Sequence, residues 1–121
     1  MQIKSSIVGS SFYPGAGNII MRLRPGAKLV LRREPNNQYD KNAIAVLFSN
    51  TKLGHVGRGL AALLAPRMDA GLIVSCEKHP ANGAVISLSW DEAMAPADAT
   101  PIEGDAEGDR NFMLRFKGLG L

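Results

Sequence analysis

Short apolar runs separated by tight turns are the feature that most restricts how this chain can fold. Pro14-Gly15 and Pro25-Gly26 punctuate the sequence, and such pairs mark turns because proline fixes φ whereas glycine admits positive φ. Just after the second pair, Lys28–Arg33 alternates, with Leu29 and Leu31 on one face. Alternation of this kind is typical of a half-buried strand. We therefore predict a mainly β fold made of brief strands.

Other segments have strand character because β-branched or large apolar residues dominate them between turn residues. They are Lys4–Phe12, Ala43–Phe48, Lys52–Val56, Leu72–Lys78 and Ala84–Trp90, with Ser49-Asn50-Thr51 as the expected hairpin turn. A shorter apolar run, Ile19–Leu23, ends at the Pro25-Gly26 turn. Roughly six short strands predict a small, partly closed β-barrel.

One segment, Arg58–Ala70, changes to a helical period. Leu60, Leu63, Leu64 and Met68 recur at helical spacing, and Gly71 follows as a plausible C-cap. Pro66 lies inside this pattern, and it predicts a kink or a break because proline removes a backbone donor.

The charge is distributed unevenly along the chain. Residues 1–90 hold eleven Lys or Arg against four Asp or Glu, a balance of +7, whereas residues 91–121 hold three against seven, a balance of −4. A body this basic suits a polyanion. The expected organisation is a barrel domain over residues 1–90, an acidic Ala/Pro/Gly-rich linker or mobile loop over 91–110, and a short strand or appendage over 111–121.

Signatures of catalysis and of cofactor binding are missing. Cys76, His55 and His79 lie in separate segments without paired ligand spacing, so we expect no metal site, and no phosphate loop or dinucleotide fingerprint occurs. Cys76 fits a buried structural thiol within a strand. No apolar stretch reaches the ~20 residues of a membrane helix, and no secretory signal opens the chain. We predict a cytoplasmic, membrane-free, cofactor-free protein that is not an enzyme.

Two polar and aromatic clusters remain as candidate binding residues. The first pairs Phe12 with Tyr13 at the end of a strand, and the second places Tyr39 in a polar loop among Asn, Asp and Arg. Exposed rings beside cations offer stacking surfaces for nucleic-acid bases. The other interpretation is that Phe12 and Tyr39 belong to the core and that the Asn and Asp side chains shape an Asx-turn. The residues alone leave both interpretations open.

At these positions the sequence resembles the HIRAN domain, a module of helicase-like fork-remodelling proteins. Three blocks carry the resemblance in order: Ile7-Val8-Gly9 with Phe12-Tyr13, the run Arg33–Val46, and Leu53-Gly54-His55-Val56 leading into Leu60-Ala61. The middle block is the specific one, because it contains Glu34-Pro35-Asn36-Asn37-Gln38-Tyr39-Asp40-Lys41-Asn42-Ala43-Ile44. The resemblance implies an OB-like barrel of about six strands with one or two short helices, which agrees with the pattern of turns.

The resemblance also implies roles for individual residues. Phe12 and Tyr39 would stack on bases, with Tyr13 beside them, and Asp40 would accept a hydrogen bond from a terminal 3′ hydroxyl. Asn37 would shape the loop or contact the terminal nucleotide. His55 would donate to a backbone phosphate.

The chain departs from the family pattern at Ser11, where a well-known member has a DNA-binding arginine. Arg33, Lys41, Arg58 or Arg32 would then supply the phosphate contacts. The expected function is that of a stand-alone, non-catalytic module that binds single-stranded DNA with a free 3′ end, in repair or at stalled forks, with a helicase or nuclease chain as a possible partner. The alternative is a protein-interaction adaptor that keeps the barrel without binding DNA.

Overall fold

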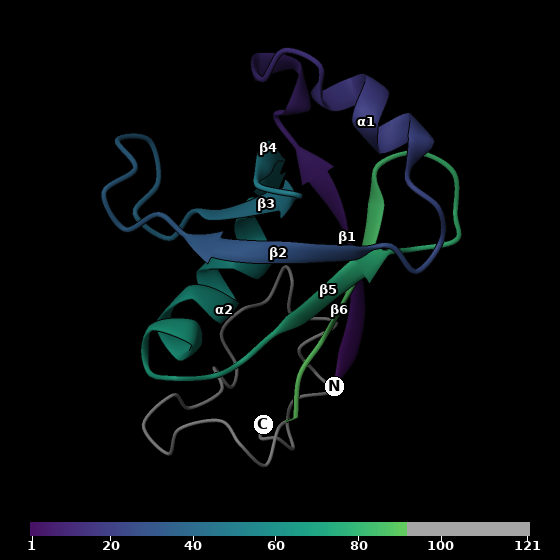
Figure 1. Cartoon of the computed structure of the whole chain (residues 1–121). Coiled ribbons are helices and arrows are strands. Elements are labelled where there is room, and N and C mark those ends of the chain that lie inside the picture. The colour runs from purple at the N-terminus through teal and green to yellow at the C-terminus, as the bar shows by residue number, and fades with distance from the viewer. Residues whose placement is uncertain (92–121) are drawn as a thin grey trace.

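A closed barrel of six antiparallel strands forms the body of the protein in the computed structural model, which describes residues 1–91 (Figure 1). In chain order the elements are β1 (Gln2–Val8), the 3-10 helix η1 (Ser10–Phe12), α1 (Ala16–Arg22), β2 (Lys28–Arg33), β3 (Ile44–Phe48), β4 (Thr51–Val56), α2 (Arg58–Asp69), β5 (Ser75–Lys78) and β6 (Val85–Ser89). The prediction of a mainly β barrel with one or two short helices is confirmed. Apart from Asp91, the expected linker and C-terminal strand lie outside the described residues.

β1 closes the barrel because it pairs with two neighbours. Gln2–Ser6 pairs with β6, whereas Ile7 and Val8 pair with β4. The full order is β1-β4-β3-β2-β5-β6, and every pair is antiparallel. Closure leaves none of the six described strands with an open sheet edge.

Inward-facing side chains of the strands meet one face of α2 in a single core. The largest fully buried side chains are Ile44, Val46, Leu53, Leu64, Ile86 and Leu88. Leu29 of β2 is buried and Leu31 is partly buried against the same core, as the alternation of that strand predicts. Burial of these apolar side chains is the main favourable term in folding.

The apolar run Ile19–Leu23 is mostly helical and forms the second half of α1. Ala16 and Ile20, four residues apart, are the buried positions of this helix. Such a short run does not reveal its period by itself, since one turn of helix and a short strand can carry the same apolar residues. In Figure 1, α1 lies at the top of the barrel.

Of the kink or break expected at Pro66, the break is wrong, because α2 continues through this residue to Asp69. Pro66 is exposed and removes only one backbone N–H donor from the helix. Leu60, Leu63 and Leu64 on the buried face pack against the core and stabilise the helix. Among residues 1–91, no helix combines the length and the apolar character needed to cross a membrane.

The first strand ends earlier than the sequence predicts. β1 stops at Val8, and Gly9 adopts a left-handed conformation with φ of 75° before η1 begins. Phe12 therefore projects from a 3-10 turn and not from the end of a strand. The turn leaves Phe12 exposed, whereas the neighbouring Tyr13 packs partly against the core.

Candidate functional site

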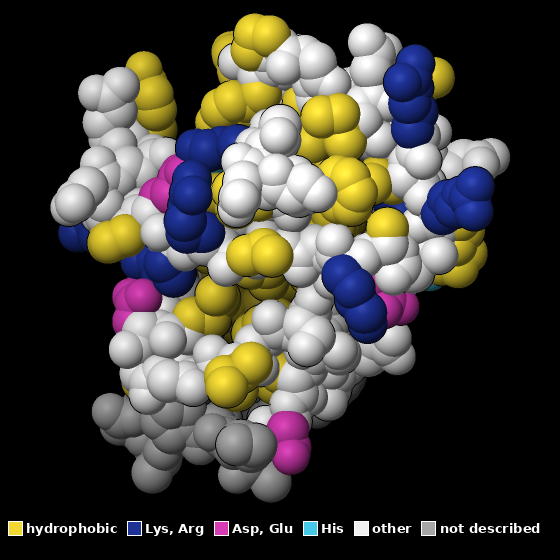
Figure 2. All heavy atoms as spheres, in the orientation of Figure 1, with side chains coloured by type: hydrophobic (Ala, Val, Ile, Leu, Met, Phe, Trp, Pro, Cys, Tyr) yellow, Lys and Arg dark blue, Asp and Glu magenta, His cyan; other side chains and the backbone are white. Residues whose placement is uncertain are grey.

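A hollow of about 910 Å³ opens between η1 and the loop of residues 34–43. In Figure 2 a notch separates this loop, at the left, from the top of the molecule. The first hollow, as we call it, is lined by Val8, Gly9, Phe12, Tyr13, Asn37, Gln38, Tyr39, Asp40, Ala43, His55, Val56 and Arg58. Three chain segments that are distant in sequence thus meet at one place, and most of the sequence-predicted site residues lie there.

Two aromatic rings stand exposed at this hollow. Phe12 is 81% exposed and Tyr39 is 80% exposed. Neither ring belongs to the core, so the interpretation of both as core residues is wrong. An exposed aromatic side chain forgoes the favourable free energy of burying its apolar surface in the free protein. The same surface is flat, apolar and available to a ligand.

Side chains of the 34–43 loop fix its backbone from within. The Oδ1 atom of Asn37 accepts the backbone N–H groups of Tyr39 at 2.8 Å and Asp40 at 3.0 Å. The Oδ1 atom of Asp40 accepts the N–H of Asn42 at 2.9 Å. The Asx-turn interpretation is therefore confirmed for this loop, and the same hydrogen bonds hold Tyr39 outward.

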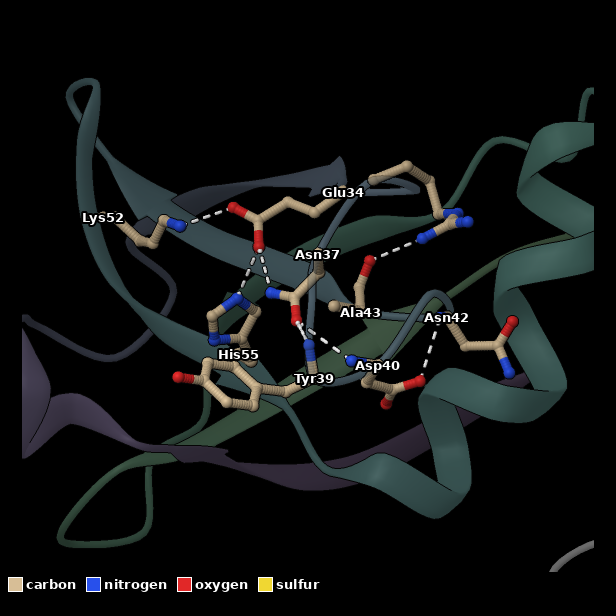
Figure 3. A network of polar contacts seen from close by, with 9 residues as sticks. Glu34, Asn37, Tyr39, Asp40, Asn42, Ala43, Lys52 and His55 are labelled. Atoms are coloured by element: carbon tan, nitrogen blue, oxygen red, sulfur yellow. Dashed lines mark hydrogen bonds and ion pairs between the residues drawn. The ribbon is translucent and has the colours of Figure 1, made fainter.

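The Glu34 carboxylate connects this loop to the strand on the other side of the hollow (Figure 3). Its Oε1 atom accepts the amide of Asn37 at 3.1 Å and lies 2.7 Å from Nε2 of His55. Its Oε2 atom pairs with the ammonium group of Lys52. The Glu34 side chain is only 17% exposed, so these partners satisfy a carboxylate that water barely reaches.

The pKa of Glu34 depends on the balance between its burial and its hydrogen bonds. Burial raises it, but hydrogen bonds from Lys52, His55 and Asn37 together outweigh burial and lower it from 4.5 to about 2. Glu34 is therefore an anion throughout the neutral range, and it fixes the donors around it.

Acid should remove the stability that Glu34 contributes. Because its folded-state pKa is depressed, this contribution is fully present above pH about 4.5, is on the order of 2 kcal/mol, and is lost as the pH falls toward about 2. We expect the difference in unfolding free energy between the wild type and Glu34→Gln to shrink between pH of about 6 and about 2.5. Urea titrations followed by tryptophan fluorescence measure it, and a difference that stays constant would contradict the prediction.

His55 presents one edge of its ring to Glu34 and lines the hollow. A carboxylate only accepts, so the proton lies on Nε2, and Nδ1 is the nitrogen left for a ligand. A phosphate contact by His55 as a donor then requires the second ring proton. The ring also lies 6.0 Å from that of Tyr13, over which the Lys52 ammonium sits at 5.1 Å.

Arg58, the first residue of α2, reaches back to the loop tip. Its Nη2 donates to the carbonyl of Tyr39 at 3.0 Å, and its Nε lies 3.4 Å from Oδ2 of Asp40. The Arg58 side chain is 76% exposed, so this pair adds little to stability. It places one cation beside one carboxylate at the hollow, and these are the only Lys/Arg and Asp/Glu residues among its described lining residues.

Arg33 and Lys41 do not line the hollow, and neither does Arg32, the further candidate for a phosphate contact. Arg33 donates to the carbonyls of Ala43 at 2.6 Å and Lys41 at 2.9 Å, and its Nε donates to Asp69 of α2 at 2.9 Å. The guanidinium of Arg33 thus links the 34–43 loop to α2 and lies outside the lining of the hollow. Lys41 is exposed, but it stands outside the lining of the hollow. Phosphate contacts by these three residues remain predictions.

Sequence reasoning missed Glu34 and Lys52 as parts of the site. A signal for Glu34 existed, because it opens the motif three residues before Asn37. No signal existed for Lys52, since an irregular register between Val46 and Leu47 sets which residues of β4 face the loop.

Within residues 1–91, no group of His, Cys, Asp or Glu is arranged to hold a metal ion. Cys76 is buried at 4% exposure, and burial raises the pKa of its thiol to about 12. A thiol in this state is a poor nucleophile, and it agrees with the structural role predicted for Cys76.

Comparison with known proteins gives consistent matches. The sequence model of the HIRAN domain matches residues 2–90. The mouse protein "Helicase-like transcription factor" is 40% identical over 68 residues, which make up 55% of this chain and 6% of the relative. The chain therefore spans well under a tenth of the length of this relative.

Solved structures match the fold as well. The crystal structure of the HIRAN domain of human HLTF has a TM-score of 0.61 at 27% identity and covers 74% of both chains. An NMR structure of the HLTF HIRAN domain in its DNA-bound conformation has a TM-score of 0.56 at 26% identity, and it covers 99% of this chain and 90% of that one.

Proposed function

The chain belongs to the HIRAN domain family, and on this premise we propose that it binds single-stranded DNA and holds a free 3′-hydroxyl end in the first hollow. The observation that carries the proposal is the placement of two exposed rings, Phe12 and Tyr39, around a hollow that also presents the Asp40 carboxylate. The HLTF domain with this fold has a structure in a DNA-bound conformation.

The two rings suit unpaired bases. Base stacking on an aromatic side chain contributes ~1–3 kcal/mol per base and tolerates any base, since every base has a π-face. Duplex DNA hides these faces within its own stack. Phe12 and Tyr39 therefore favour a single strand whose last bases are unstacked.

Asp40 suits a strand end. One of its oxygens accepts the N–H of Asn42 and the other lies 3.4 Å from Arg58, and a carboxylate oxygen can accept more than one hydrogen bond. A terminal 3′ hydroxyl supplies a donor. An internal nucleotide supplies a phosphodiester anion at the same position instead, and the like charge disfavours it.

Arg58 would then hold the phosphate next to the terminal nucleotide, with protonated His55 as a second donor. We propose no catalysis by this domain. In the cell it would direct a helicase or a nuclease chain to exposed 3′ ends, in repair or at stalled forks.

Fluorescence anisotropy with a short labelled single strand tests the end preference. We expect the wild type to bind the 3′-hydroxyl strand at least about tenfold more tightly than the 3′-phosphate strand, since like charges brought together across an interface cost about 1.4 kcal/mol or more. Asp40→Asn should reduce this ratio to near one, because the amide lacks the charge but keeps an oxygen for the Asn42 N–H. Equal affinity of the wild type for both strands would refute end recognition.

One observation favours a second function, that of a protein-interaction adaptor. Arg58 is the only Lys or Arg among the described residues that line the hollow, and Ser11 leaves a small hydroxyl where a well-known member of the family has an arginine. Salt separates the two functions. Single-strand binding weakens with a slope of about −0.7 per neutralised phosphate, whereas an adaptor would give no DNA signal at low salt.

A further inference from the structure

We propose a second DNA contact on this molecule: a hollow bordered by Arg22 and Arg24 that takes the part of the single strand lying 5′ of the end held in the first hollow. This inference rests on the proposed function, because the direction of the strand follows from the position of its 3′ end. The second hollow lies where α1 ends and β2 begins.

The second hollow has an apolar floor. It encloses about 570 Å³ and is lined by Ile19, Arg22, Leu23, Arg24, Pro25, Gly26, Ala27 and Phe48. Ile19, Leu23 and Phe48 are only partly buried against the core, so each leaves part of its surface to a ligand. Figure 2 shows dark blue Lys and Arg side chains beside yellow hydrophobic ones over α1 and the connection that follows it.

The two arginines are free to bind an anion. Both are exposed, and within residues 1–91 neither guanidinium takes part in a hydrogen bond or an ion pair. Two other cations of the barrel are already paired, since Lys28 lies 3.5 Å from Glu77 and Lys52 pairs with Glu34. A guanidinium presents a planar set of donors that matches phosphate oxygens.

An apolar floor with two flanking arginines matches a single strand in particular. The bases would lie on the ring of Phe48 and its aliphatic neighbours, and the phosphates would meet Arg22 and Arg24. The balance of +7 over residues 1–90 adds a long-range attraction for the same polyanion.

One DNA strand of a few nucleotides can reach from the first hollow to the second. The first hollow includes His55 and Val56 at the end of β4, and the second includes Phe48 at the hairpin that leads into β4. Six residues of strand extend over about 17 Å, which corresponds to about five stacked nucleotides. α1 packs on β4 and joins the Tyr13 side of the first hollow to Arg22.

The test compares strands of about four and about twelve nucleotides, both with a 3′ hydroxyl, by anisotropy with the full chain. The wild type should bind the longer strand about tenfold more tightly, and Arg22→Ser with Arg24→Ser should remove most of this gain while leaving the short-strand affinity within about twofold. The salt slope for the long strand should fall by about 1.4.

Lys4→Ser with Lys28→Ser is the matched control, because it removes the same number of positive charges from exposed residues that line neither hollow. It should keep the length-dependent gain. Equal wild-type affinity for both lengths, or a gain that survives loss of Arg22 and Arg24, would overturn the second contact while the 3′-end preference stands. A gain that depends on both arginines without any 3′-hydroxyl preference would support the second contact and refute the proposed end recognition.

Discussion

Replacement of Gly54 by alanine is expected to destabilise the barrel by about 3 kcal/mol or more. Gly54 has φ of 149°, and an added Cβ atom would lie 2.5 Å from the carbonyl oxygen of Val8 and 2.6 Å from Cγ2 of Ile7. Both obstacles belong to β1, which is held at each edge by a neighbouring strand. Relief of the contact would require β1 and β4 to separate at the point where the barrel closes.

Gly83→Ala separates the two causes of this loss. Gly83 also has positive φ, at 86°, but an added Cβ atom there meets nothing within 4 Å. Its cost should be only about 1 kcal/mol, from backbone conformation alone. Urea unfolding followed by fluorescence of Trp90, the single buried tryptophan, measures both variants. Similar losses for the two would show that the close approach of β1 and β4 carries no cost.

Loss of both stacking rings should produce the largest change in DNA affinity. Phe12→Ala and Tyr39→Ala should each weaken single-strand binding by ~1–3 kcal/mol, and the double variant by roughly the sum, since the rings extend from separate segments. That sum corresponds to at least about thirtyfold in affinity. Because both rings are about four-fifths exposed, the unfolding free energy should change by less than about 0.5 kcal/mol.

Ile73→Ala provides the control for these rings. Ile73 is 75% exposed, but it lies between α2 and β5 and lines neither hollow. Its removal should leave DNA affinity unchanged, as anisotropy would show. Retention of most affinity by the Phe12→Ala, Tyr39→Ala double variant would mean that bases do not stack on these side chains.

The sequence predicts the barrel well because strands and turns are local features. The alternation of Lys28–Arg33 and the Pro-Gly pairs depend only on residues next to one another. The α1 helix was harder to predict, because only Ala16 and Ile20 of its seven residues are buried. The helical spacing of Leu60, Leu63, Leu64 and Met68 favoured a helix through Pro66 whereas the proline favoured a kink or a break, and packing of the buried face on the core decided between them.

In the candidate site, contacts between near neighbours were predictable from the sequence, whereas contacts between distant residues were not. Asn37 accepts hydrogen bonds from backbone groups only two and three residues ahead, so residues within the motif itself fix the shape of the loop. Nothing in the sequence indicates that the guanidinium of Arg33 donates to Asp69, which lies 36 residues away. A sequence does not distinguish a basic side chain that faces a ligand from one that pairs with a carboxylate of the same chain.

The sequence by itself determined the brief strands, since these follow from dihedral preferences and from alternation between near neighbours. It offered the Asx-turn and the exposed aromatic rings as two open interpretations. Only the tertiary structure decided that Glu34 joins Lys52 and His55, which are 18 and 21 residues away, and that Phe48 lies beside Arg22 and Arg24. Those contacts depend on strand register and on barrel closure. Register and closure are set by packing of the whole core, and no short segment contains that information.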